Sequence, residues 1–96
     1  MFAVIFRAKV ALLDDQYSIM ASEMRDLAIE KYGCLEFVAT TEGEDEIAIS
    51  YWPDEDSISR WKSDTKHIKA QKLGQSKWYK SYTVEVVELK RKYSSN

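Results

Sequence analysis

Apolar residues recur at every second position near the start of the chain, from Phe2 to Val10. This period of two predicts a strand. Between Tyr17 and Ala28 the apolar residues follow at helical spacing instead, and Asp14 and Asp15 precede them, where carboxylates suit a helix N-terminus. Gly33 predicts the end of that helix, because glycine readily adopts the left-handed conformation found there.

The middle of the chain shows the same two patterns. Alternating apolar residues predict strands at 35–39 and 47–51, joined by a polar hairpin loop at 41–44. Asp54 is a suitable N-cap for a second helix, whose apolar face runs from Ile58 to Ile68.

The last part of the chain completes one domain. Gly74 ends the second helix, a short turn at 76–79 follows, and residues 82–89 predict a final strand. The order β-α-β-β-α-β is that of the ferredoxin-like fold, an α+β class with an antiparallel sheet. We therefore expect a single domain at 1–90, followed by a polar C-terminal tail at 91–96.

The strands predict a partner because their second faces are also apolar in part. We assign Ile5, Val38, Ala48 and Trp52 to the faces that point away from the helices, and the last strand is apolar on both sides. Only one face of the sheet can pack against the two helices. A second copy of the sheet would cover the other face, so the chain is expected to form a homodimer.

Composition excludes several classes of function. The chain has 96 residues and a net charge of −2, which gives no general attraction for nucleic acid or for an anionic membrane. No apolar run is long enough to span a membrane, and no signal peptide is expected, so a cytoplasmic location is predicted. Cys34 is the only cysteine and His67 the only histidine, so no metal site is expected.

Charge is distributed unevenly along the chain. Acidic residues dominate 36–56 and basic residues dominate 60–80. Two solvated faces of opposite sign are one interpretation. The other is a basic rim that attracts an anionic ligand.

Half of the aromatic residues lie between Tyr51 and Tyr82, with His67 among them. Tryptophan and tyrosine combine an apolar body with a polar tip, so this cluster suits a pocket for a flat ligand, or else it simply fills the core. His67 is the one group that ordinarily titrates near neutral pH, which makes it the candidate proton carrier. It can face such a pocket only if the second helix breaks near Asp64 and Thr65; in a continuous helix it would face solvent.

Several short stretches of the second half resemble one known family. They are Tyr51-Trp52, residues 58–62, residues 67–71, Gly74, residues 78–82 and residues 84–86. In this order they are similar to the antibiotic biosynthesis monooxygenases, in detail over about residues 44–90. The resemblance implies a dimeric α+β barrel with a cleft between the sheet and the helices in each subunit. It also implies either cofactor-free oxygenation of aromatic molecules or oxidative heme degradation.

Heme degradation is the less favoured of these two activities. The heme-degrading branch has an asparagine on the first strand and a histidine ten residues after the tryptophan that matches Trp61. This chain has Arg7 and Gln71 at the corresponding places, and His67 lies only six residues after Trp61.

The leading hypothesis is a cofactor-independent monooxygenase that acts on a small aromatic or quinol-like molecule. His67 would be the catalytic base, without any cofactor or metal. The residues expected to contact the substrate are Tyr51, Trp61, Gln71, Trp78 and Tyr79. The alternative is a non-catalytic dimeric module, stress-related or otherwise devoted to binding a small ligand, in which the same residues only shape a cleft. The sequence alone does not decide whether the chain is an enzyme.

Overall fold

Four strands and two helical regions follow one another in the predicted order, and the second helical region is divided into two helices. A computed structural model describes residues 1–95. Its elements are β1 (Phe2–Val10), α1 (Asp15–Glu30), β2 (Glu36–Glu42), β3 (Asp45–Trp52), α2 (Glu55–Lys62), α3 (Thr65–Leu73), a short π-helical segment η1 (Gly74–Trp78) and β4 (Tyr79–Glu88). The predicted turn at 76–79 is thus mostly helical, and the last strand begins three residues earlier than expected.

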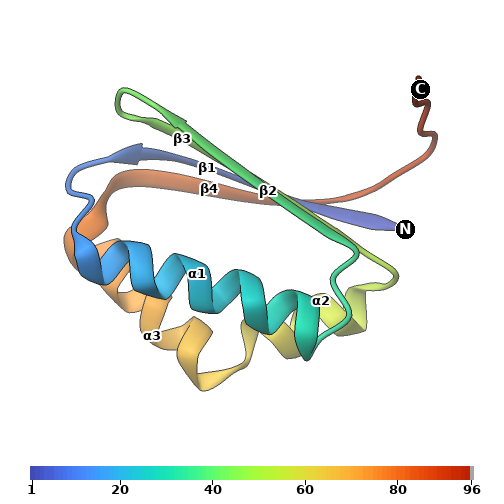
Figure 1. The fold of residues 1–96 in the computed structure, drawn as a ribbon, viewed down its shortest axis with the longest axis horizontal. Coiled ribbons are helices and arrows are strands. Elements are labelled where there is room, and N and C mark those ends of the chain that lie inside the picture. Colours follow the sequence, from blue (N-terminus) through green and yellow to red (C-terminus); the bar gives the residue numbers. More distant parts are fainter. Residues whose placement is uncertain (96) are drawn as a thin grey trace.

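The strands form one antiparallel sheet in the order β2-β3-β1-β4. All three helices lie on the same face of this sheet, and no helix of residues 1–95 covers its other face (Figure 1). This is the expected α+β, ferredoxin-like βαββαβ arrangement. The dimeric barrel that the resemblance implies stays a prediction, because a single chain is described here.

Side-chain caps explain where the first two helices begin. The carboxylate of Asp14 accepts a hydrogen bond from the Tyr17 amide at 2.8 Å, and that of Asp54 accepts one from the Ser57 amide at 2.7 Å. Each bond satisfies an amide that the first turn of a helix leaves without a partner. After α1, Gly33 has a φ of +80°, the left-handed conformation predicted for it.

The orientation of β3 differs from the prediction. Phe2 lies opposite Trp52 and Phe6 opposite Ala48 in the register of β1 and β3, so these four side chains share one face of the sheet. That face packs against the helices, and Trp52 is completely buried there. The assignment of Ala48 and Trp52 to the outer face was therefore wrong. Because β3 is apolar at both alternating sets of positions, its hydrophobic pattern alone could not fix its orientation.

The core fills the space between the sheet and the ends of α1 and α2. Its buried members are Val4, Met24, Ala28, Cys34, Trp52, Ile58 and Trp61. Cys34 is thus a small core residue, as expected. No helix of the described residues is long and apolar enough to cross a membrane. In the predicted tail, residues 91–95 have no regular secondary structure, and Asn96 lies outside the described residues.

Candidate ligand-binding cavity

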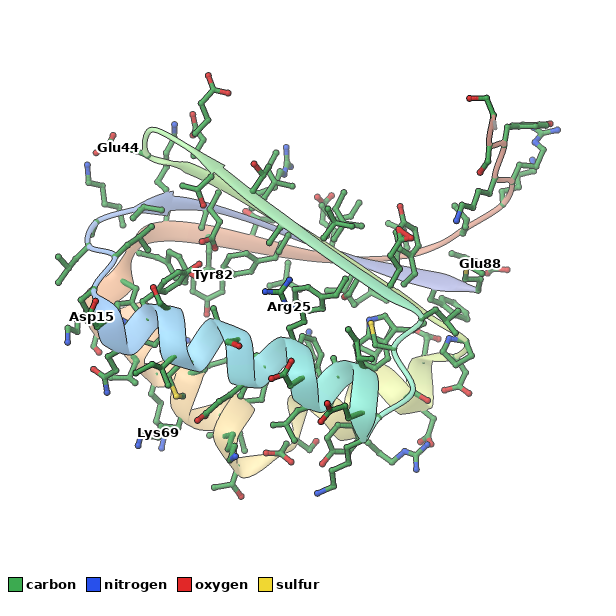
Figure 2. The ribbon with its side chains drawn as sticks, in the orientation of Figure 1. Asp15, Arg25, Glu44, Lys69, Tyr82 and Glu88 are labelled. Carbon is green, nitrogen blue, oxygen red and sulfur yellow. The ribbon has the colours of Figure 1, made fainter. Side chains whose placement is uncertain are left out.

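A cavity of about 190 Å³ lies between the sheet and the helices. The strands contribute Val4, Phe6, Phe37, Ala39, Glu46, Ala48, Ser50, Tyr79, Tyr82 and Val84 to its lining. The helices, including η1, contribute Tyr17, Met20, Ala21, Met24, Trp61, Lys62, His67, Ala70, Gln71, Gly74 and Trp78. Figure 2 shows Tyr82 extending from the sheet toward the helices, whereas Lys69 extends away from them. Since a cavity of ~150 Å³ holds benzene, this one suits a molecule of about one or two rings.

A break between α2 and α3 brings His67 to the cavity. α2 ends at Lys62 and α3 begins at Thr65, and the Asp64 carboxylate caps α3 by accepting from the Lys66 amide at 2.9 Å. The predicted break near Asp64 and Thr65 is therefore confirmed. Because α3 takes a new direction, the His67 ring meets the Trp61 ring edge-on, with 4.4 Å between the centroids.

The surroundings of His67 keep its imidazole neutral. The pKa of His67 is lowered from 6.5 to about 4, chiefly because burial disfavours the charged form and secondly because the Lys62 ammonium lies nearby. Its Nδ1 atom is buried and has no hydrogen-bond partner among the described residues. At pH 7 the ring is thus an uncharged, partly unsatisfied polar group in an aromatic wall.

Trp61 forms a fixed wall beside this imidazole. Its indole Nε1 donates a hydrogen bond to the carbonyl of Met24 at 3.1 Å, and its ring packs on Trp52 with centroids 5.1 Å apart. Only 6% of Trp61 is exposed. Gln71 lies one turn beyond His67 on α3, and both of these proposed site residues line the cavity.

Three other side chains form a hydrogen-bonded cluster in the cavity wall: Tyr17, Glu46 and Tyr79. The Tyr17 hydroxyl donates to Oε1 of Glu46, and the Tyr79 hydroxyl donates to Oε2 at 2.9 Å. Burial in the first place, and the Glu46 carboxylate in addition, raise the pKa of both tyrosines, so both stay protonated at neutral pH. Glu46 is only 4% exposed, and within residues 1–95 no lysine or arginine pairs with it.

Glu46 was not predicted as a site residue, because it stands in an acidic run that was interpreted as solvated. A signal was nevertheless available: Glu46 has the same strand parity as Ala48 and Trp52, which are both apolar. Once Trp52 is placed on the helix side, Glu46 must point to that side as well. Tyr17 was predicted on the apolar face of α1, but its hydroxyl was given no role.

Tyr51 is the one proposed contact residue that the structure places elsewhere. It pairs with Ala3 in the register of β1 and β3, so its side chain lies on the uncovered face of the sheet. There the ammonium of Lys92 lies 5.6 Å from its ring. The assignment of Tyr51 to the cavity wall is therefore corrected, and its neighbour Ser50 lines the cavity instead. The error has the same origin as the reversed orientation of β3.

Trp78 and Tyr79 line the cavity as predicted, together with Trp61, His67 and Gln71. The Trp78 ring is buried and meets Tyr17 edge-on at 5.2 Å. Its indole Nε1 is buried and has no hydrogen-bond partner among the described residues. Trp78 thus contributes an apolar ring surface to the cavity wall, with its one donor left unpaired.

The basic run is largely solvated or paired. Lys77 forms an ion pair with Asp14 at 2.7 Å, and Lys80 forms one with Glu44 at 2.6 Å. Of the basic residues in 60–80, the cavity lining includes Lys62. The arrangement favours two solvated faces over a basic rim that concentrates anions.

Known structures share this fold over nearly the whole chain. SnoaB, a cofactor-independent oxygenase from Streptomyces nogalater, superposes with a TM-score of 0.81 at 9% identity, covering 98% of this chain and 97% of SnoaB. Rv0793 from Mycobacterium tuberculosis gives 0.81 at 11% identity, covering 97% and 98%. An antibiotic biosynthesis monooxygenase gives 0.67 at 16% identity, covering 93% and 98%. The chain thus has the fold of the antibiotic biosynthesis monooxygenases, and the resemblance seen in the sequence is confirmed at this level.

Sequence similarity to one further protein shows the family to which the chain belongs. YqjZ, an uncharacterized protein of Bacillus subtilis strain 168, is 35% identical over 91 residues, which are 94% of this chain and 80% of YqjZ. The chain belongs to the family of YqjZ. No protein-family model matches it.

Proposed function

We propose that the chain is a cofactor-independent monooxygenase that acts on a small aromatic or quinol-like molecule held in the cavity. The observation that carries the proposal is the neutral imidazole of His67, buried beside Trp61 with an unsatisfied nitrogen. A neutral imidazole can accept a proton from the substrate. The shared fold with SnoaB supports the same assignment by analogy.

The reaction needs no added reductant if the substrate supplies the electrons. His67 would take a proton from an acidic O–H or C–H of the ligand, and the resulting electron-rich anion would reduce O₂. For a phenol, the product is a quinone: the O–H and one ring C–H are replaced by two carbonyl groups. One oxygen atom of O₂ becomes the new carbonyl oxygen, and the other leaves as water with the two hydrogens removed. Trp61, Gln71, Trp78 and Tyr79 would hold the ring and keep bulk water away.

The low pKa of His67 makes it a weak base until the substrate is charged. Burial lowers the pKa because an isolated imidazolium is poorly solvated in the cavity. A substrate anion formed beside the ring would offset this penalty by direct attraction, so proton transfer and anion formation would stabilise each other. Proton uptake by His67 is thus expected only with a bound substrate.

Measurement of oxygen consumption tests the proposal. Purified protein with EDTA should consume O₂ in the presence of small anthrone-like or quinol substrates, and His67→Phe should reduce the rate by about 100-fold or more, since general bases contribute ~10²–10⁴-fold. Lys69→Ala is the matched control, because Lys69 lies on the same helix but points away from the cavity (Figure 2). Ligand binding without oxygen consumption would support the alternative, a non-catalytic binding module.

We also propose that the uncovered face of the sheet forms a homodimer interface. Val38, Ile47 and Val87 on this face are 52%, 41% and 39% exposed, which leaves apolar surface in water. Sedimentation at micromolar concentration should give twice 11.2 kDa. Ile47→Glu should produce a monomer, whereas Ile29→Glu on the outer side of α1 should not. A wild-type monomer at this concentration would contradict the proposal.

A further inference from the structure

The cluster of Tyr17, Glu46 and Tyr79 can accept further hydrogen bonds but has no hydroxyl hydrogen left to donate. Each tyrosine has a single hydroxyl hydrogen, and both hydrogens are already donated to Glu46. Each carboxylate oxygen, by contrast, can accept more than one hydrogen bond, and each tyrosine oxygen still has lone pairs. Toward the cavity the cluster therefore offers acceptors alone, and a ligand that binds there must bring the hydrogen.

The carboxylate is also incompletely satisfied for a buried group. Glu46 is 4% exposed and receives one hydrogen bond at each oxygen. A buried charge is stabilised by additional donors or by a cation, and within residues 1–95 no cation contacts it. A third donor would thus be bound strongly, because hydrogen bonds to charged groups exceed neutral ones in strength.

The cluster and His67 lie toward different ends of the cavity. Glu46 lies at the hairpin end of β3, whereas Trp52 lies at the opposite end of the same strand face. The Trp52 ring packs on Trp61, which in turn contacts His67. A flat ligand anchored at Glu46 therefore extends along the apolar strand residues toward the imidazole.

We propose that the carboxylate of Glu46, held by Tyr17 and Tyr79, anchors a hydroxyl group of the substrate, and that the substrate class is phenols of one or two rings. A neutral hydroxyl is favoured over an organic cation because it costs far less to desolvate than an ammonium group. This assignment rests on the proposed function, in that the cavity is taken to be the substrate site, and it adds which group of the substrate is recognised.

Calorimetric titration at pH 7 with three probes of similar shape tests the assignment. The probes are 2-naphthol, its methyl ether 2-methoxynaphthalene, and 2-naphthylmethylammonium. Wild-type protein should bind the naphthol ~10- to 100-fold more tightly than the ether, the range expected for a hydrogen bond to a charged acceptor. In Glu46→Gln this ratio should fall below ~3-fold, because a neutral amide accepts far more weakly. Glu44→Gln makes the same exchange on the exposed hairpin and should keep the wild-type ratio.

Three outcomes would overturn the assignment: equal affinities of wild-type protein for the naphthol and the ether, tighter binding of the ammonium probe, or an unchanged ratio in Glu46→Gln. The first two need no variant, so they hold even if Glu46→Gln does not fold. Oxygen consumption separates this assignment from the proposed function. A preference for the hydroxyl without oxygen consumption would leave Glu46 as the anchor and remove the oxygenation.

Discussion

The two ends of the cavity hold buried titratable groups with opposite hydrogen-bonding situations. At one end the carboxylate of Glu46 accepts from two tyrosine hydroxyls. At the other end the imidazole of His67 has a buried nitrogen without a partner and touches Trp61 through its ring edge. Glu46 thus stabilises the fold through its hydrogen bonds. A hydrocarbon side chain could replace most of what His67 contributes to the fold.

This difference separates two reasons for burying a polar group. A buried group that satisfies its neighbours is costly to remove, because the neighbours are then left without partners. A buried group with an unsatisfied atom lowers the stability of the fold, and its presence calls for a ligand or a reaction as an explanation. The same substitution at Glu46 and at His67 should therefore change the stability of the fold by very different amounts.

The largest expected effect comes from replacing each group by leucine. Glu46→Leu leaves the hydroxyls of Tyr17 and Tyr79 without their acceptor, and at ~1–3 kcal/mol for each buried donor the free energy of unfolding should fall by ~2–6 kcal/mol. His67→Leu removes no hydrogen bond between side chains and should change the free energy of unfolding by less than ~1 kcal/mol at pH 7. Urea denaturation followed by tryptophan fluorescence measures both values.

Two further variants test the reason for this asymmetry. Glu46→Gln keeps an acceptor for the tyrosines and should recover most of the loss seen with leucine. The triple replacement of Tyr17 and Tyr79 by phenylalanine together with Glu46→Leu removes donors and acceptor at once and should also lie closer to wild type. Equal losses for Glu46→Leu and His67→Leu would show that the two ends do not differ as described.

The next effect is the dependence of stability on pH, which should arise at the His67 end. Above pH 6.5 the imidazole is neutral in both the folded and the unfolded chain. Between pH 6.5 and about 4 the unfolded chain takes up a proton that the folded chain does not, so folding becomes less favourable as the pH falls. At 1.36 kcal/mol per pKa unit the complete loss is about 3–3.5 kcal/mol.

The His67→Leu variant isolates this contribution. Carboxylates with a lowered pKa, such as Asp14, Asp54 and Asp64, also lose stabilisation in acid, but they do so in both proteins. The difference between wild type and variant should therefore grow in favour of the variant as the pH falls from 7 to 4. Because His67 is the only histidine, its proton NMR titration is unambiguous, and a midpoint near 6.5 would contradict the buried, neutral imidazole.

The sequence was sufficient for the fold and for one end of the cavity. The order of elements, the caps at Asp14 and Asp54, and the break near Asp64 all depend on local patterns that a sequence displays directly. His67 could be found because a lone histidine among aromatics is conspicuous. Its orientation depended only on that helix break.

The other end could not be found because it depends on the orientation of a strand. β3 is apolar at both alternating sets of positions, so its pattern does not reveal which set faces the helices. Because the wrong set was assigned to the helix side, Tyr51 was predicted in the cavity and Glu46 in solvent. Register with β1 resolves this ambiguity, and pairing between strands distant in sequence is not visible in local periodicity.

The smallest expected effect on stability concerns Gly74, which lies under the Tyr79 ring at the Glu46 end. A Cβ atom at position 74 would lie 3.0 Å from Cδ2 and 3.1 Å from Cε2 of Tyr79, closer than an ordinary contact. Gly74→Ala should gain up to ~1 kcal/mol of helix propensity, because the backbone there is helical. Displacement of Tyr79 should weaken its hydrogen bond to Glu46 by ~0.5–1.5 kcal/mol, so the net change in stability should stay within about 1 kcal/mol.

A change so small in stability should still be visible in binding at the Glu46 end alone. With one tyrosine displaced, the preference of Gly74→Ala for 2-naphthol over its methyl ether should fall several-fold, whereas the NMR midpoint of His67 should stay near 4. Combining the change with Tyr79→Ala removes the ring that the new methyl group meets, so in that background Gly74→Ala should only stabilise, by ~0.5–1 kcal/mol. If Gly74→Ala has the same effect on stability in both backgrounds, its Cβ atom does not act through Tyr79. A shifted His67 midpoint in Gly74→Ala would show that the two ends of the cavity are not independent.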